Sequence, residues 1–270
     1  MRLTVPLGLL VTLVATGCSG QDWRTATREP AGMAPDPAST PEAVVQVYAA
    51  RAVRWRGWFG VHTWIAVKPT GADAFTVYEV MGWRLRRSDT AVVVRERAAD
   101  AHWFGRRPEL LGDIRGSGVD AIIERIEDAV ECYPWAGTYR VWPGPNSNTF
   151  TAFVLREVPE LAVDLPPTAI GKDYLGRRLG ARAPGGAGYQ LNAFGVLGVL
   201  AGAREGLEAN VLGLTFGVDP LGLAIKLPVV GRLGWPRDDT PTVIDAAAGD
   251  ASARAATDTP GCTVYSAPSS

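Results

Sequence analysis

The sequence predicts an α+β fold in which helices pack against an antiparallel sheet. Two observations lead to this prediction. Short runs of β-branched and aromatic residues are joined by turn residues in the first part of the chain, up to about residue 97. Segments whose apolar residues recur at helical spacing follow, one near residue 120 and one near residue 150.

The strands come first along the chain. Each of four segments combines β-branched and aromatic side chains in a short run, which is typical of a strand. The second and third of these segments flank the turn sequence PTGAD, which predicts a hairpin. The four segments span residues 43–50, 60–68, 74–85 and 90–97.

Two helices and a short strand are expected next. The first helix covers residues 118–133, where the apolar side chains repeat at helical spacing and Pro134 follows the end. A short strand is expected at residues 138–142. The second helix begins after Ser147, where apolar residues fall at positions i, i+3 and i+4, and it stops before Pro159.

A long apolar segment, residues 189–234, is punctuated by glycines. Its longest uncharged run, residues 189–203, is too short to cross a bilayer as a helix. We interpret the segment as buried strands joined at the turn sequence AREG. The alternative is a surface that lies against a membrane, and periodicity alone does not decide between the two.

The N-terminus has the layout of a secretory signal. Arg2 precedes an apolar run that is too short for a membrane span, and small residues then lead to Cys18. The sequence VATGC resembles the lipobox of bacterial lipoproteins, which implies cleavage before Cys18 and diacylation of its thiol. The alternative is an ordinary secretion signal with an incidental cysteine.

These features divide the chain into a signal peptide, a tether, one folded domain and a tail. Residues 1–17 are the signal, and the polar, proline-rich residues 18–41 are a flexible tether after the lipidated cysteine. Residues 42–234 form a single α+β domain, and residues 235–270 a disordered tail. The expected location is the cell envelope, on the periplasmic face of the outer membrane if the cell is Gram-negative.

Composition narrows the classes of function. The formal net charge is −1, which gives no argument for binding nucleic acid. The chain has two histidines and three cysteines, without a CxxC or HExxH motif, so we expect neither a metal centre nor a cofactor. Cys132 and Cys262 either pair in a compartment that permits disulfides or remain separate.

One pair of residues is a candidate for chemistry. His62 lies on a predicted strand, and Ser147 stands where a helix begins. Unpaired N–H groups at a helix start stabilise an anion, and an imidazole facing them can act as a base. Glu79, on the next strand, is the candidate carboxylate for orienting His62. The backbone N–H of Ser147 is one candidate oxyanion donor, and the second is taken from Asn146, Asn148 and Tyr139.

The two short sequences that carry this pair resemble the circularly permuted papain-like proteins. HTWIAV is similar to their histidine strand, and NSNTFTAFV is similar to the start of their nucleophile helix. This group includes NlpC-related peptidases, lecithin-retinol-acyltransferase-like enzymes and PPPDE peptidases. The resemblance implies that Ser147 is the nucleophile and His62 the base. The chain departs from the pattern in one respect, because Ser147 replaces the cysteine of those families.

A second resemblance covers nearly the whole mature body. The sequences HTWIAVKP, WPGPNSNTF, LPPTAIGKDYL and LGLTFGVDP resemble the bacterial family named domain of unknown function 3750. That family implies no known activity.

Two functions are compatible with these patterns. The first is a membrane-tethered envelope lipoprotein that hydrolyses or transfers an acyl group at an amide or ester, in peptidoglycan peptide or in lipid. The second is a non-catalytic envelope protein that uses the same cleft to bind a peptide, a glycan or a lipid. In that case Ser147 only caps its helix, since serine and asparagine are among the best N-cap residues.

Overall fold

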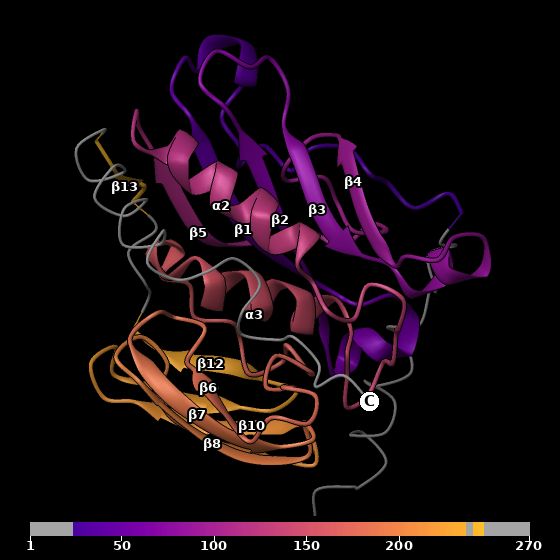
Figure 1. Ribbon diagram of the computed structural model, residues 1–270, viewed down its shortest axis with the longest axis vertical. Helices are drawn as coiled ribbons and strands as arrows, with labels where there is room; N and C mark the ends of the chain where they lie inside the picture. Colours follow the sequence, from indigo (N-terminus) through magenta and orange to yellow (C-terminus); the bar gives the residue numbers. More distant parts are fainter. Residues whose placement is uncertain (1–23, 236–239, 246–270) are drawn as a thin grey trace, which may run out of the picture.

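The computed structural model describes residues 24–235 and 240–245. The protein has mixed α and β content, with two sheets and with helix α3 lying between them (Figure 1). The predicted α+β class is thereby confirmed, and the second sheet adds an element that the sequence did not separate from the first. The predicted signal peptide and Cys18 lie outside the described residues.

The first sheet has six strands in the order β13-β5-β1-β2-β3-β4. Its strands pair antiparallel, except for β13, which runs parallel to β5. The predicted hairpin is formed by β2 and β3. The strands are β1 (Val44–Arg51), β2 (Val61–Lys68), β3 (Thr76–Val80), β4 (Val92–Glu96), β5 (Glu109–Arg115) and β13 (Thr242–Val243).

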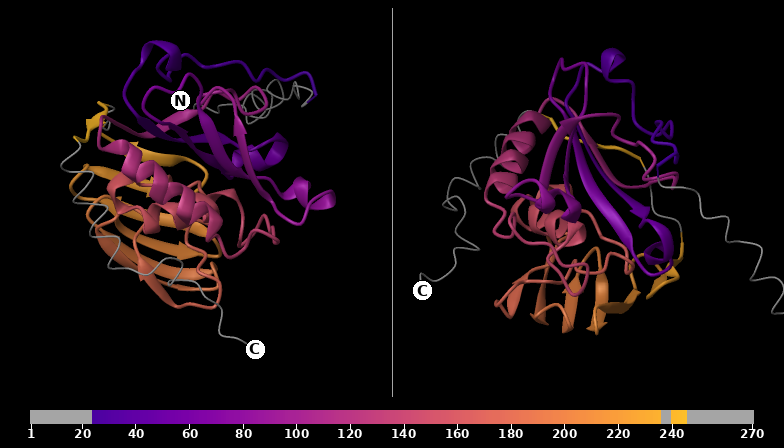
Figure 2. Two further views of the ribbon diagram at one scale, coloured as in Figure 1. Left: turned by 45° about the horizontal axis from the view of Figure 1, so that its top comes forward. Right: turned by 90° about the vertical axis from the view of Figure 1, so that its right-hand side faces the viewer.

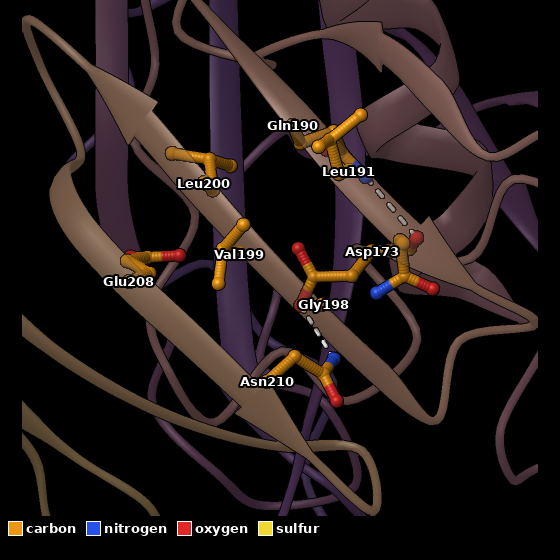
Figure 3. Close-up of a pocket in the computed structure, with 9 residues that line it drawn as sticks. Asp173, Gln190, Leu191, Gly198, Val199, Leu200, Glu208 and Asn210 are labelled. Atoms are coloured by element: carbon orange, nitrogen blue, oxygen red, sulfur yellow. Dashed lines mark hydrogen bonds between the residues drawn. The ribbon is translucent and has the colours of Figure 1, made fainter.

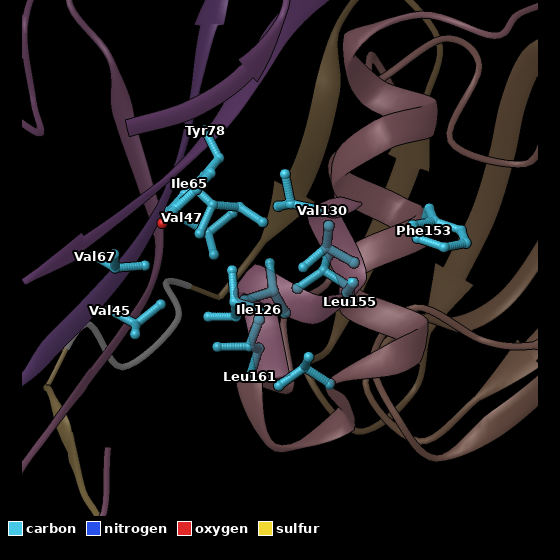
Figure 4. Packing of buried hydrophobic residues seen from close by; sticks show 14 of the residues in the cluster. Val45, Val47, Ile65, Val67, Tyr78, Ile126, Val130, Phe153, Leu155 and Leu161 are labelled. Carbon is cyan, nitrogen blue, oxygen red and sulfur yellow. The ribbon is translucent and has the colours of Figure 1, made fainter. Parts of the chain in front are cut away.

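Both predicted helices are present, as α2 (Val119–Glu131) and α3 (Ser147–Glu157). They cover one face of the first sheet, where side chains of β1, β2 and β3 meet side chains of α2 and α3 in one apolar cluster (Figure 4). Ser147 to Arg156 of α3 are all buried, because the helix is covered on its other side as well. The short 3-10 helices are η2 (Pro37–Ser39), η3 (Arg54–Trp58), η4 (Gly82–Arg86) and η5 (Pro159–Leu161).

The second sheet is a seven-stranded antiparallel meander in which each strand pairs with the next along the chain. Gly206 shows why glycine recurs in its turns, since its φ is +74° and a Cβ atom there would overlap the carbonyl oxygen of Val218. The strands are β6 (Gly180–Arg182), β7 (Gly188–Ala193), β8 (Leu197–Gly202), β9 (Gly206–Val211), β10 (Leu214–Asp219), β11 (Ala224–Leu227) and β12 (Gly231–Gly234).

Two segments that were expected to lie outside the domain pack against it. The backbone N–H groups of Met33 and Ala34 donate to Oδ2 of Asp100, at 2.6 and 3.2 Å, so this part of the expected tether is held on the first sheet. In the expected tail, β13 pairs with β5. Polar composition failed as a guide here because backbone hydrogen bonds and a few apolar side chains, Met33 and Ala34 in one segment and Ile244 in the other, are enough to hold both segments.

One of the three cysteines lies in the described part of the chain. Cys132 ends α2 as its C-cap residue and is disulfide-bonded. The other cysteines of the chain, Cys18 and Cys262, both lie outside the described residues. In the described part of the chain, no helix has the length and apolar character that crossing a membrane requires.

Candidate functional site

His62 and Glu79 lie on the face of the first sheet that is turned away from α2 and α3. They are on neighbouring strands, β2 and β3. The Nε2 atom of His62 is 2.9 Å from the Oε2 atom of Glu79. The second carboxylate oxygen of Glu79 accepts a hydrogen bond of 2.9 Å from the guanidinium of Arg95. The structure thus brings together the histidine and the carboxylate that was expected to orient it.

Burial and hydrogen bonding set the protonation of this pair. Desolvation lowers the pKa of His62 from its usual 6.5, against the effect of Glu79. Burial alone would raise the pKa of Glu79, but the hydrogen bond from His62, the charge that His62 carries when protonated, and the charges of Arg97 and Arg95 outweigh burial and hold this pKa at about 2. At neutral pH the pair is therefore a neutral imidazole donating its Nε2–H to a carboxylate anion.

Aromatic rings cover His62 on this face. The ring of Trp103 stacks on the imidazole with the centroids 3.7 Å apart and an angle of 11° between the planes. Trp83 stacks on Trp103 in turn and is half exposed. His62 itself is only 6% exposed. Its surroundings are those of a packed histidine that holds a buried carboxylate.

The start of α3 is fixed by asparagine side chains. Asn146 is the N-cap, and its Oδ1 accepts hydrogen bonds from the backbone N–H groups of Asn148 and Thr149, at 2.9 and 3.2 Å. The hydroxyl of Thr149 accepts from the backbone N–H of Asn146 and completes a capping box. The amide nitrogen of Asn146 also donates to the carbonyl oxygens of Val141 and Ile170, both at 3.0 Å.

Ser147 and Asn148 are tied to the helix-facing side of β2. The hydroxyl of Thr63 lies 3.3 Å from the carbonyl oxygen of Ser147 and 3.1 Å from Oδ1 of Asn148. The amide nitrogen of Asn148 donates to the carbonyl oxygens of Val61 and Ile170. Ser147 is the first residue of α3 and is 4% exposed. Since the Asn146 and Asn148 amides hold the helix in place, they have no free N–H group for an oxyanion.

The two halves of the expected catalytic pair lie on opposite faces of the first sheet. Thr63 contacts the start of α3, and successive side chains of a strand point to opposite faces, so His62 points away from Ser147. The expectation that His62 faces the Ser147 hydroxyl is therefore not met. Tyr139 is also elsewhere, with its ring against Gly82 of η4.

The inner face of the second sheet carries a buried network of charges. The ammonium group of Lys226 lies 2.6 Å from a carboxylate oxygen of Glu208 and 2.6 Å from one of Asp164. Lys172 pairs with the other oxygen of Glu208 and, at 3.6 Å, with Asp173. Burial alone would lower the pKa of Lys172, but the neighbouring carboxylates outweigh burial and raise it.

This network is packed solid. Asp173, Gln190, Glu208 and Asn210 gather on the inner side of β7, β8 and β9, and Asn210 donates to Asp173 at 2.8 Å (Figure 3). The space that these residues line has no room for a water molecule. The cluster therefore fixes the second sheet to the rest of the protein and offers no room for a ligand.

The outer face of the second sheet is apolar and exposed. Its central row runs across four strands, Leu191 opposite Val199, then Ala209, then Phe216. Leu191 is 62% exposed, Val199 57% and Phe216 44%. A parallel row contains Tyr189, Ala201, Leu207, Val218, Ile225 and Leu233. We call these two rows the apolar face.

Sequence reasoning missed this arrangement, although its signal was present. In YQLNA and LEANV apolar and polar residues alternate, which predicts a strand with two different faces. The apolar side chains of these strands were expected inside, with a surface against a membrane as the open alternative. The structure corrects this expectation, because the polar face is the buried one and pairs with charges from the 164–173 loop.

Together these features define a class: an α+β protein whose central helix lies between a six-stranded sheet and a seven-stranded sheet with an exposed apolar face. Residues 42–174 match the sequence model of the family described as Protein of unknown function (DUF3750), the family that the sequence resembles. The match covers the first sheet apart from β13, together with both helices, and ends before the second sheet. No curated protein and no solved structure matched the chain. Among the described residues, no group of three or more His, Cys, Asp and Glu is arranged to hold a metal ion.

Proposed function

We propose that this protein is a non-catalytic protein of the cell envelope that is held at a membrane through a lipid on Cys18 and that works by binding through its apolar face. One observation carries the proposal. The second sheet buries its polar side chains and exposes its apolar ones, and an exposed apolar patch of this extent marks an interaction site. The disulfide at Cys132 supports an oxidising compartment.

The alternative, a permuted papain-like acyl hydrolase or acyltransferase, needs the His62 ring beside the Ser147 hydroxyl. Instead, β2, the strand that carries His62, directs Thr63 toward α3, the helix that begins at Ser147. Asn146, Asn148 and Thr149 account for the start of α3 by capping and anchoring it. The geometry thus favours the binding function over the enzyme.

Cell fractionation tests the binding function. A tagged chain with Cys18→Ser, which lacks the expected lipid, should still sediment with the membrane fraction. The same chain with Leu191→Thr, Val199→Thr and Phe216→Thr should move to the soluble fraction, because threonine keeps the strand propensity while removing the apolar contacts. If the two chains fractionate alike, the apolar face is not the binding surface.

A fluorophosphonate probe tests the enzyme. We expect no adduct at Ser147 and no change of labelling in His62→Ala. We also expect Ser147→Ala to unfold within about 0.5 kcal/mol of the wild type, whereas Asn146→Ala should lose about 2 kcal/mol with its cap and its hydrogen bonds. Labelling at Ser147 that disappears in His62→Ala would instead support the acyl hydrolase or acyltransferase.

A further inference from the structure

We propose that the partner of the apolar face is the surface of an anionic lipid bilayer. The inference rests on the proposed function, since it names the partner of the same face. It assigns a membrane contact to the second sheet that is separate from the expected lipid on Cys18. Figure 2 shows the second sheet at one end of the molecule, with its outer side turned away from the first sheet and both helices.

The extent of the apolar face is the first argument. Its large side chains are about half exposed. Aromatic side chains have areas of about 150–250 Å² each and the aliphatic ones somewhat less, so the eight large side chains of the two rows together present on the order of 1,000 Å² of apolar surface. Monomeric proteins rarely leave more than about 300–600 Å² in one patch, and a specific protein interface buries about 800 Å² per partner. The face is therefore large enough to bind on its own.

The charges around the face are the second argument. From residue 177 to residue 235, the exposed charged side chains are all cationic: Arg177, Arg178, Arg182 and Arg204. The acidic side chains of the same segment are all buried, namely Glu205, Glu208 and Asp219. The two rows of the apolar face contain no charged residue. An uncharged apolar surface with an arginine rim is complementary to apolar acyl chains below anionic headgroups.

The positions of the aromatic residues are the third argument. Tyr189 and Trp235 lie at one end of the strands and are 73% and 74% exposed. Phe194 lies in the β7–β8 turn at the other end and is also exposed. Tyr189 and Trp235 have an apolar body and a polar group, and such rings are enriched at the level of lipid headgroups, which the margins of a docked sheet would occupy, whereas Phe194 adds only apolar surface.

Other occupants fit less well. The C-terminal segment outside the described residues, 246–270, has only Val264 and Tyr265 as large apolar residues, which is far less apolar surface than the apolar face presents. A second copy of the chain would bury two such faces against each other. It would bring no anionic side chain to the exposed Arg177, Arg182 and Arg204, because the acidic side chains of the second sheet are buried, whereas an anionic bilayer supplies negative charge.

Vesicle co-sedimentation tests the proposal. The predicted mature chain, residues 18–270 with Cys18→Ser, is mixed with vesicles of phosphatidylcholine alone or of phosphatidylcholine with about one third phosphatidylglycerol. We expect binding to the anionic vesicles that is at least about tenfold tighter than to the neutral ones and that weakens with salt. The variant Leu191→Thr/Val199→Thr/Phe216→Thr should lose binding to both.

The arginine rim is tested with a variant matched in charge. Arg177→Gln/Arg182→Gln/Arg204→Gln should lose most of the preference for anionic vesicles. Arg84→Gln/Arg86→Gln/Arg87→Gln makes the same charge change on exposed residues of and beside η4, on the first sheet, and should bind like the wild type. Equal effects of the two variants would mean that net charge, not the rim, determines binding.

The outcomes separate this inference from the proposed function. In one outcome the protein does not bind vesicles, but the Cys18→Ser chain still sediments with cell membranes through its apolar face. That outcome would show that the partner is not the lipid bilayer, and it would leave the proposed binding function standing. A concentration-dependent dimer in sedimentation that the apolar-face variant abolishes would identify a second copy as the occupant. If the Cys18→Ser chain neither binds vesicles nor sediments with the membrane fraction of cells, both proposals are wrong.

Discussion

His62 illustrates how a single side chain is defined by its contacts. Its ring is stacked on Trp103 and donates to Glu79, which is itself fully buried. Such a histidine is neutral in the folded protein and becomes protonated more easily once the chain unfolds. Its role is to donate a hydrogen bond to a buried carboxylate in the first sheet. Because the folded protein disfavours the protonated ring, the free energy of unfolding decreases at acidic pH.

The pH dependence of stability tests this interpretation. Because the pKa of folded His62 lies below the unfolded value of 6.5, the unfolded state binds its proton first and stability falls as the pH drops below 6.5. The contribution of Glu79, with a folded pKa of about 2 and an ordinary value of 4.5, is lost only below pH 4.5. Urea unfolding should therefore show a lower free energy of unfolding at pH 5 than at pH 7, by at most about 2 kcal/mol, the limit for one site with an unfolded pKa of 6.5.

The matched variant is His62→Gln, whose amide retains a donor toward Glu79 but does not titrate. Its free energy of unfolding should change less than that of the wild type over the same interval. An identical slope in the two proteins would place the titrating group elsewhere.

At the scale of elements, the second sheet is attached by charges rather than by an apolar core. Glu208 on β9 joins Lys226 on β11 to Lys172, which lies in the loop after α3. Buried ion pairs add little net stability against an apolar replacement, but breaking one leaves an uncompensated charge. The network therefore fixes how this sheet is placed against the rest of the protein.

Glu208→Gln should destabilise the protein by about 3 kcal/mol, because two buried lysines then share a neutral amide. Glu124→Gln removes a carboxylate from the exposed side of α2 and should stay within about 0.5 kcal/mol of the wild type. Urea unfolding of both variants at neutral pH is the measurement. Similar small changes would show that water reaches the network and screens it.

At the scale of the molecule, α3 makes the two sheets interdependent. One side of the helix packs on the first sheet, and Arg156 on its other side donates to the carbonyl oxygen of Arg182 and to Oε1 of Gln190. The family match ends at residue 174, yet the buried polar groups of that part find their partners in the second sheet. We therefore expect the two sheets to unfold as a single unit.

Truncation tests this unity. A chain that ends at residue 178 leaves Arg156 and Lys172 without their partners in the second sheet, so we expect no cooperative thermal transition by near-ultraviolet circular dichroism. A chain that ends at residue 235 keeps both sheets apart from the edge strand β13, and it should retain a cooperative transition. A sharp transition in the shorter chain would show that the first sheet folds alone.

Much of the fold was readable from the sequence. Periodicity located α2 and α3, and the turn after residue 68 predicted the hairpin of β2 and β3. The choice of His62 and Glu79 as neighbours followed from strand pairing, and the structure places them in contact. These features depend on the spacing of apolar and turn residues along the sequence, which is fixed before the chain folds.

The sequence by itself determined both helices and strands β1 to β4. It did not predict β5, and the short strand expected at residues 138–142 does not form. Only the tertiary structure decided which face of each strand is inside, because alternation separates two faces without saying which of them meets a helix. On β2 that choice turned Thr63 toward Ser147 and His62 away. In the second sheet the polar face forms ion pairs with charged residues of the 164–173 loop and is buried, so the apolar face lies on the outside.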